Sequence, residues 1–163
     1  MRRLDDIDWA DWSAVDTATL VFIVRDGRVL LIRKKRGLGA GKINGPGGRL
    51  DPGETLEACA VREVEEELRV TPLDLEQLGE HRFQFVDGYS IHVFVYRAEA
   101  LRGKPVETDE AIPLWFPTDD LPFEEMWEDD PMWLPLVLEG RRFRGRYIFD
   151  GDRMVDHELE VLS

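Results

Sequence analysis

Short runs rich in β-branched and aromatic residues recur along the chain and predict a β-sheet. The first two, residues 17–25 and 28–33, are joined by Asp26-Gly27, a dipeptide typical of tight hairpin turns. Both runs carry apolar side chains on their two faces, so we expect the sheet to be covered on both sides. Further strands are expected at 75–79, 81–86 and 89–99, at 114–116 as a short buried strand, and in two runs between 142 and 162.

Two other segments have the pattern of helices. Residues 55–68 contain no Pro or Gly. Residues 126–140 include Asp129 and Asp130, either of which can cap a helix, followed by Pro131 in its first turn. One helix between the strands and a second late in the chain predict an α/β fold, an α/β/α sandwich with a mixed central sheet.

The helix expected at 55–68 has an unusual inner face. On a wheel of about 100° per residue, an apolar stripe through Cys59, a small core residue, is continued by Glu63 and Glu67. Glu66 lies about 60° to one side. Acids crowded on an inward face repel one another and resist burial unless a cation neutralises them. Carboxylates at i, i+3 and i+4 suit a divalent ion such as Mg²⁺, which also contacts phosphates.

Length, charge and cysteine content narrow the class of protein. The 163 residues are enough for one domain, here 17–163, preceded by an acidic N-terminal arm, 1–16, whose Trp9 and Trp12 are expected to dock on it. A net charge of −13 argues against binding to polymeric nucleic acid, which needs a basic face. The single cysteine and the lack of a long apolar run lead us to expect a cytoplasmic monomer with no membrane partner.

A glycine-rich loop precedes the acidic helix. Residues 34–48 contain six glycines and begin with Lys34, Lys35 and Arg36, cations that offset the acidic field for an anionic substrate. Loops of this kind let backbone groups approach a ligand closely. A flexible connector is the simpler interpretation of the loop alone, but its place beside a carboxylate cluster favours phosphate binding.

The stretch from 48 to 70 resembles the signature box of the Nudix hydrolases: glycine, five residues, Glu, seven residues, then Arg-Glu-apolar-x-Glu-Glu-x-Gly-apolar. The matching residues are Gly48, Glu54, Arg62, Glu63, Val64, Glu66, Glu67 and Val70. One position departs, because Arg69 stands where the family has a glycine that ends the helix in a left-handed conformation. A non-glycine residue there costs about 1 kcal/mol, which affects the helix end and not the carboxylates. The alternative is an exposed acidic helix with chance spacing.

The resemblance narrows to the branch of that family that hydrolyses oxidised purine nucleoside triphosphates, the MutT-like sanitising enzymes of the animal type. It is carried by residues 34–50, 103–116 and 121–138, and it covers roughly 17–160. It implies a Nudix fold, with Arg62 orienting the glutamates by charge-assisted hydrogen bonds. It also implies Mg²⁺, with Mn²⁺ as a substitute, bound by Glu63, Glu66, Glu67, Glu110 and the backbone carbonyl of Gly47.

For the nucleobase, the same resemblance implies that the amide of Asn44 reads the purine edge and that Trp127 stacks on the ring. Asp129 and Asp130 would close the pocket. The other substrate contacts that it implies are Thr19, Lys34, Leu38, Phe83 and Phe85. Leu38 and Ile43 stand where this branch commonly has aromatic residues, so the resemblance supports the chemistry more strongly than the base selectivity.

The adjacent aspartates have a physical interpretation of their own. In a partly dry pocket the two are not both charged, and one holds a proton near neutral pH. A carboxylic acid then donates while its neighbour accepts, which suits the keto and N–H edge of an oxidised guanine, and moving the proton would accommodate an oxidised adenine. The alternative is that Asp129 or Asp130 only caps the helix.

The expected reaction is attack of water on a phosphorus of a triphosphate such as 8-oxo-dGTP, giving the monophosphate and pyrophosphate, with Glu63 or Glu66 as the base. The expected partner is thus a small nucleotide. The alternatives are a Nudix enzyme for ADP-ribose, a dinucleoside polyphosphate or an RNA cap, or a non-catalytic nucleotide-sensing domain. A sensing domain would be expected to have lost acids from the box, and this chain keeps them.

Overall fold

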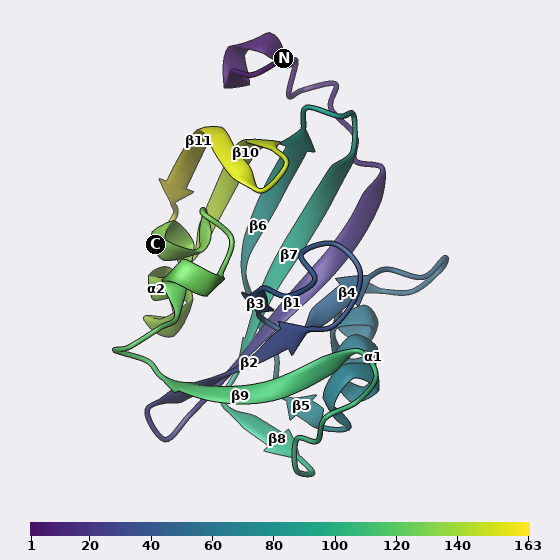
Figure 1. Ribbon diagram of the computed structural model, residues 1–163, viewed down its shortest axis with the longest axis vertical. Helices are drawn as coiled ribbons and strands as arrows, with labels where there is room; N and C mark the ends of the chain where they lie inside the picture. The colour runs from purple at the N-terminus through teal and green to yellow at the C-terminus, as the bar shows by residue number, and fades with distance from the viewer.

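A nine-stranded mixed sheet forms the centre of the molecule in the computed structural model, which describes residues 1–163 (Figure 1). Its main path runs β11-β10-β6-β7-β1-β2-β3, while β4 pairs with β1 and β9 pairs with β2. The β1–β7 and β6–β10 pairs are parallel and the other pairs are antiparallel. The strands are β1 (Asp16–Arg25), β2 (Arg28–Lys34), β3 (Ile43–Asn44), β4 (Gly47–Arg49), β6 (Glu76–Phe85), β7 (Ser90–Ala98), β9 (Ala111–Pro117), β10 (Phe143–Asp150) and β11 (Arg153–Val161).

Two hydrophobic cores lie on opposite faces of this sheet, because successive side chains of a strand point to opposite sides. Val21 and Ile23 of β1 pack with the apolar side of α1 (Leu56–Leu68), whereas Phe22 packs with Trp133 of α2 (Asp130–Leu138). The two helices cover different parts of the sheet (Figure 1). The predicted α/β/α arrangement with a mixed sheet is confirmed.

Several strand boundaries differ from the prediction. The runs at 75–79 and 81–86 form one strand, β6, with a register shift between Gln77 and Gly79. The run at 114–116 lies inside the longer β9, and it is wrong to call it buried, because Trp115 is 36% exposed on a strand that pairs only with β2. A separate two-stranded sheet, β5 (Thr71–Leu73) with β8 (Ala100–Arg102), was not predicted, since its pairing joins residues about 30 apart.

Helix α1 begins and ends as its sequence predicts. The Thr55 hydroxyl accepts a hydrogen bond from the amide of Ala58 at 3.1 Å, which caps the first turn. Arg69 ends the helix in the left-handed conformation, with φ 61° and ψ 30°. The position keeps the backbone that the family's glycine would adopt, although a side chain with a Cβ occupies it.

Helix α2 begins at the expected place but without the expected cap. Asp129 stands at the N-cap position with a helical backbone, and its carboxylate makes no capping hydrogen bond. It instead accepts from the indole Nε1 of Trp133 at 2.7 Å, inside the protein. Asp130 makes no capping bond either, and Pro131 removes one of the amides that a cap would bind. The prediction that either aspartate caps α2 is therefore wrong.

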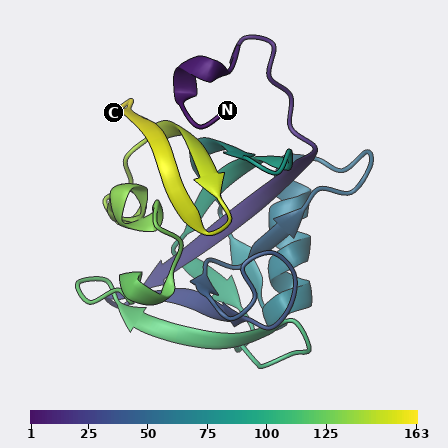
Figure 2. The same ribbon diagram turned by 45° about the horizontal axis from the view of Figure 1, so that its top comes forward.

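The first fifteen residues form an arm that packs against the end of the sheet (Figure 2). It contains one 3₁₀ turn, η1 (Leu4–Asp6), and a second such turn, η2 (Phe123–Glu125), precedes α2. The indoles dock on cations, with Arg146 over Trp9 and Arg82 over Trp12. No helix of the structure combines the length and the apolar composition that crossing a membrane requires.

Candidate active site

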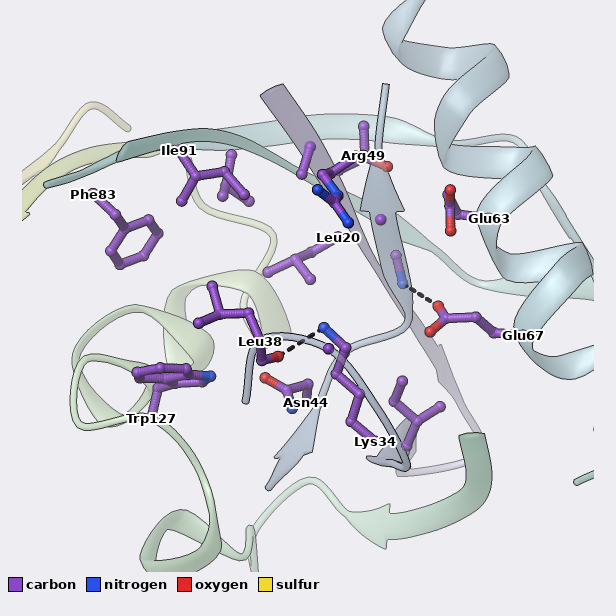
Figure 3. A pocket seen from close by; sticks show the side chains of 18 of the residues that line it. Leu20, Lys34, Leu38, Asn44, Arg49, Glu63, Glu67, Phe83, Ile91 and Trp127 are labelled. Atoms are coloured by element: carbon purple, nitrogen blue, oxygen red, sulfur yellow. Dashed lines mark hydrogen bonds between the residues drawn. The ribbon is translucent and has the colours of Figure 1, made fainter. Parts of the chain in front are cut away.

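An open cavity of about 1190 Å³ lies between α1 and the start of α2 and is floored by the sheet. Figure 3 shows Glu63 and Glu67 from α1 on one side of it and Phe83 and Trp127 on the other. The structure places around this cavity the residues proposed for catalysis, metal binding and substrate binding: Thr19, Lys34, Leu38, Asn44, Gly47, Arg62, Glu63, Glu66, Glu67, Phe83, Phe85, Glu110, Trp127, Asp129 and Asp130.

Arg62 organises the carboxylates at the α1 end. Its guanidinium donates to both oxygens of Glu54, at 2.7 and 2.9 Å, and to Oε1 of Glu63 at 2.8 Å. It also reaches Glu66 at 3.2 Å and the backbone carbonyl of Arg49 at 3.0 Å. The hydrogen bonds from Arg62 lower the pKa of Glu54 to about 2, so Glu54 is a fixed anion that holds the arginine in place.

Glu67 is the most buried of the three helix acids, with 3% of its surface exposed. Burial raises its pKa to about 8, although the Gly47 amide donates to its Oε1 at 2.7 Å and opposes that shift. Figure 3 marks this bond. Burial also raises the pKa of Glu63. Two acids that burial drives toward their neutral forms are poised for a neighbouring cation, which would reverse the shift.

Close backbone contact explains one glycine of the box. A Cβ atom at Gly48 would lie 2.2 Å from Oε2 of Glu63, so the carboxylate occupies the space that any other residue would fill. Strand β4 carries Gly48 beside Thr19 of β1, and this pairing sets the backbone against the inner face of α1. The glycine thus places a main-chain segment directly beside a carboxylate.

Two loops extend the site beyond α1. Glu110 lies at the cavity wall, and its Oε1 accepts from Arg36 at 3.1 Å. Lys34 donates to the backbone carbonyl of Leu38 at 2.8 Å, and burial lowers its pKa. Leu38 is 48% exposed at the cavity mouth.

The donor set at the α1 end fits a hard divalent cation. Glu63, Glu66, Glu67 and Glu110 offer only carboxylate oxygens, the ligands that Mg²⁺ prefers. The carboxylates do not converge on one point in this arrangement, and no group of three or more potential ligands is close enough to enclose an ion. Arg62 binds Glu63 and Glu66 while Glu67 bonds to Gly47, so ion binding requires these side chains to turn.

Trp127 dominates the opposite end of the cavity. Lys42 lies over its ring, 5.2 Å from the centroid, and Phe85 and Phe149 meet it edge-on. Trp127 lines the cavity, whereas Lys42 does not. A Cβ atom at Gly39 would lie 2.8 Å from the indole Nε1, which shows that the glycine-rich loop packs directly against it.

Asp129 and Asp130 lie beside Trp127 and are 2% and 6% exposed. Burial raises the pKa of Asp129 to about 6, and burial together with the neighbouring charge raises that of Asp130 well above its ordinary value. The bond from Trp133 favours the charged form of Asp129, and the backbone of Trp127 with the charge of Lys42 opposes the pKa shift of Asp130. Burial and mutual repulsion therefore favour protonation within the pair, more strongly at Asp130 than at Asp129.

Comparison with known proteins agrees with this geometry. The NUDIX domain family matches residues 15–137. This chain is a Nudix hydrolase. It is 46% identical over 147 residues to an oxidized purine nucleoside triphosphate hydrolase of Danio rerio, covering 89% of this chain and 94% of that protein. The Mus musculus protein of the same name is 40% identical over the same shares. A MutT protein crystal structure from Bacillus halodurans has the same fold, with a TM-score of 0.80 at 24% identity over 90% of this chain and 98% of the other.

Thr19 and Gly47 were expected to contact the substrate and the metal ion, but in this Nudix hydrolase each contacts another protein group. Thr19 is fully buried, and its hydroxyl lies 3.5 Å from the sulfur of Cys59, so it is engaged on the α1 side of the sheet. Gly47 meets Glu67 through its amide N–H. Asn44 donates to the carbonyl of Lys42 at 3.3 Å, which leaves its side-chain oxygen without a protein donor.

Sequence reasoning missed part of the Nudix cavity wall. Leu20, Arg49, Tyr89, Ile91 and Phe149 also line it, and none was assigned to the site. The alternation along β1 and β7 could have placed Leu20 and Ile91 on the cavity face, because Phe22 and Val93 share it. Tyr89 follows a hairpin turn, and no local signal shows that this turn lies at the cavity.

Proposed function

We propose that this chain is a Mg²⁺-dependent pyrophosphohydrolase that converts 8-oxo-dGTP and related oxidised purine nucleoside triphosphates to the monophosphate and pyrophosphate. The observation that carries the proposal is one cavity with a carboxylate cluster at one end and a Trp with a paired acid at the other. Relatives at 40–46% identity named for this substrate class support it. Its role is then to remove damaged precursors from the nucleotide pool.

The phosphates belong at the α1 end. Glu63, Glu66 and Glu67, with Glu110 and the Gly47 carbonyl, are the groups proposed to hold the cation. A bound Mg²⁺, or Mn²⁺ in its place, supplies neutralisation of phosphate charge and lowers the pKa of a bound water. Arg62 keeps Glu63 and Glu66 in orientation through its bonds to both, and one of these two glutamates accepts the proton of the attacking water.

The base belongs at the α2 end. Trp127 offers a planar aromatic surface at the cavity wall, which suits stacking of a purine. The Asn44 amide and the aspartate pair present both donors and acceptors to the base edge. An 8-oxoguanine, which exposes N–H and keto groups together, meets a mixed set of this kind. Phe83 and Phe85 form the apolar wall.

A substrate comparison tests the proposal. We expect kcat/KM with Mg²⁺ to be highest for 8-oxo-dGTP, with 2-oxo-dATP next, dGTP lower and ADP-ribose lowest, and the product to be the monophosphate with pyrophosphate. Preferential hydrolysis of ADP-ribose, a dinucleoside polyphosphate or an RNA cap would assign the same chemistry to another substrate. Binding without hydrolysis of any of them would indicate a sensing domain. The site is complete within one chain, so we expect the monomer to be active.

A further inference from the structure

The N-terminal arm, residues 1–15, has no role in the reaction described above. The family match begins at residue 15, so the arm lies almost entirely outside it. In Figure 1 the chain from the arm descends beside the turn between β6 and β7. That turn reaches the nucleobase end of the cavity, because Phe85, Asp87 and Tyr89 all line it.

One side chain of the arm is tied to the turn through a buried glutamine. The Trp12 indole Nε1 donates to Oε1 of Gln84 at 2.9 Å. The amide nitrogen of Gln84 then donates to two backbone carbonyls, those of Phe85 at 3.0 Å and Tyr89 at 3.1 Å. Gln84 is 9% exposed, and these three bonds use both ends of its amide group. Trp12 thereby sets the orientation of the group that clamps the two sides of the turn.

The end of the arm makes a second connection to the same turn. The Val15 amide donates to the Ser90 hydroxyl at 2.9 Å. The Tyr89 hydroxyl donates to Asp16, the first residue of β1, at 2.9 Å, and that carboxylate also lies 3.5 Å from a guanidinium nitrogen of Arg49. Tyr89 and Arg49 both line the cavity. One carboxylate at the base of the arm thus contacts two cavity-wall residues, one in the β6–β7 turn and one on β4.

These contacts extend to the proposed base-stacking residue. The ring of Phe85 lies 5.8 Å from that of Tyr89 and 6.2 Å from that of Trp127. Movement of the turn would therefore shift the apolar wall that faces the base. We propose that Trp12, acting through Gln84, is a positioning residue that holds the β6–β7 turn in the shape required for nucleotide binding. The choice of 8-oxo-dGTP as probe rests on the proposed function. The claim that Trp12 holds the β6–β7 turn through Gln84 does not.

Trp9 supplies a matched control. It lies in the same arm, its ring is 5.5 Å from that of Trp12, and it too stacks with an arginine. Its indole N–H, however, donates to the carbonyl of Leu4 at 3.0 Å, within the arm. Trp12→Phe and Trp9→Phe therefore remove the same donor from the same segment, and only the first breaks the connection to Gln84.

Three measurements on the full chain test the proposal: KM and kcat for 8-oxo-dGTP, equilibrium binding of 8-oxo-dGMP, and hydrogen exchange of the amides of residues 85–89. For Trp12→Phe we expect KM to rise about fivefold with kcat nearly unchanged, the effect of losing about 1 kcal/mol or one hydrogen bond. Binding of 8-oxo-dGMP should weaken by the same factor, and exchange should accelerate. Trp9→Phe should resemble the wild type, and Gln84→Met, which removes all three bonds, should exceed Trp12→Phe.

Equal behaviour of the two tryptophan variants in exchange and binding would overturn the proposal. Faster exchange in Trp12→Phe without weaker binding would also overturn it, because the contact would then serve stability alone. A wild type that does not hydrolyse 8-oxo-dGTP would refute the proposed function, and exchange together with binding of the nucleotide that the wild type does accept would then decide the role of Trp12. Acceleration and weaker binding confined to Trp12→Phe and Gln84→Met would support the arm's role, and unchanged exchange would reject it.

Discussion

The two ends of the cavity are built in different ways. At the α1 end, Arg62, Glu63, Glu66 and Glu67 come from two turns of one helix, and a single guanidinium joins most of them. At the α2 end, Asn44, Phe83 and Trp127 come from distant parts of the chain and meet only after the sheet and both cores have formed. The first end is polar and networked, and the second is aromatic with an acid pair.

Because the two ends are built separately, we expect turnover and substrate preference to be changed by different substitutions. A substitution on α1 acts on carboxylates that share hydrogen bonds, so we expect its effect to spread through the cluster and to lower turnover. A substitution at the α2 end alters the surface that meets the base, so we expect a change in the order of substrates.

The largest effect is expected for Glu67→Gln. The change keeps the size of the side chain and its bond from Gly47 but removes the negative charge, so we expect kcat to fall by about a thousandfold or more. Circular dichroism should show an intact fold. Glu57→Gln, on the exposed side of the same helix, is the matched control and should keep full activity. A fully active Glu67→Gln enzyme would contradict the assignment of the α1 end.

A smaller effect is expected in the stability of the metal-free protein. The pKa of Glu67 is raised from 4.5 to about 8 by burial, so between these values the folded state binds more protons than the unfolded state. The free energy of unfolding should therefore decrease by a few kcal/mol as pH rises from about 4.5 to 8. Urea unfolding in the presence of a chelator measures this slope.

Comparison of the wild type with Glu67→Gln isolates this residue from the aspartate pair, whose pKa values are raised as well. The variant should lose the part of the slope that Glu67 contributes and keep the part that the other buried acids contribute. Added Mg²⁺ should stabilise the wild type more at pH 8 than at pH 6, because cation and proton compete for the same carboxylate. Identical slopes in the two proteins would show that burial does not raise the pKa of Glu67 in the folded state.

At the α2 end we expect a change of preference. Asp129→Asn replaces the carboxylate that accepts from Trp133 by an amide, which has one fixed donor group and one fixed acceptor. Asp130→Asn makes the same replacement at the neighbouring residue. Each should alter the ratio of kcat/KM for 8-oxo-dGTP and 2-oxo-dATP by about tenfold, the value of one well-placed hydrogen bond to the base. Unchanged ratios in both variants would remove the pair from base recognition.

The smallest effect is expected at the end of α1. Arg69 is exposed and has φ 61°, a conformation that glycine adopts without steric cost. Arg69→Gly should raise the free energy of unfolding by about 0.5–1 kcal/mol, since relief of the left-handed strain exceeds the extra entropy of glycine in the unfolded chain. Activity should not change. A loss of turnover would show that the helix end takes part in arranging the carboxylates.

The same division explains how much the sequence could predict. The positions of Glu63 and Glu67 follow from helical periodicity, and the turn at Asp26-Gly27 follows from its residues, because both depend on neighbours along the chain. At the base end, Asn44 and Trp127 could be named only through resemblance to a family. The proximity of the residues at the base end depends on the pairing of β6 with β10 and of β1 with β7.

Three features were predicted wrongly or missed because each depends on contacts that helix and strand patterns do not reveal. Asp129 was expected to cap α2, but a buried indole competes for its carboxylate. Tyr89 was not placed at the cavity, since its position depends on the arm and on Asp16. The pairing of β5 with β8 joins two short segments separated in the chain by β6 and β7, and neither segment has a sequence pattern that predicts it.

The most direct test of the division is a crystal structure with 8-oxo-dGMP and Mg²⁺ bound. The account predicts the oxidised base against Trp127, with its edge on Asn44 and the aspartate pair, and the phosphate at the α1 end with the ion among Glu63, Glu66 and Glu67. A nucleotide bound in the reverse direction would contradict it. So would an ion held elsewhere while these glutamates keep their bonds to Arg62 and Gly47.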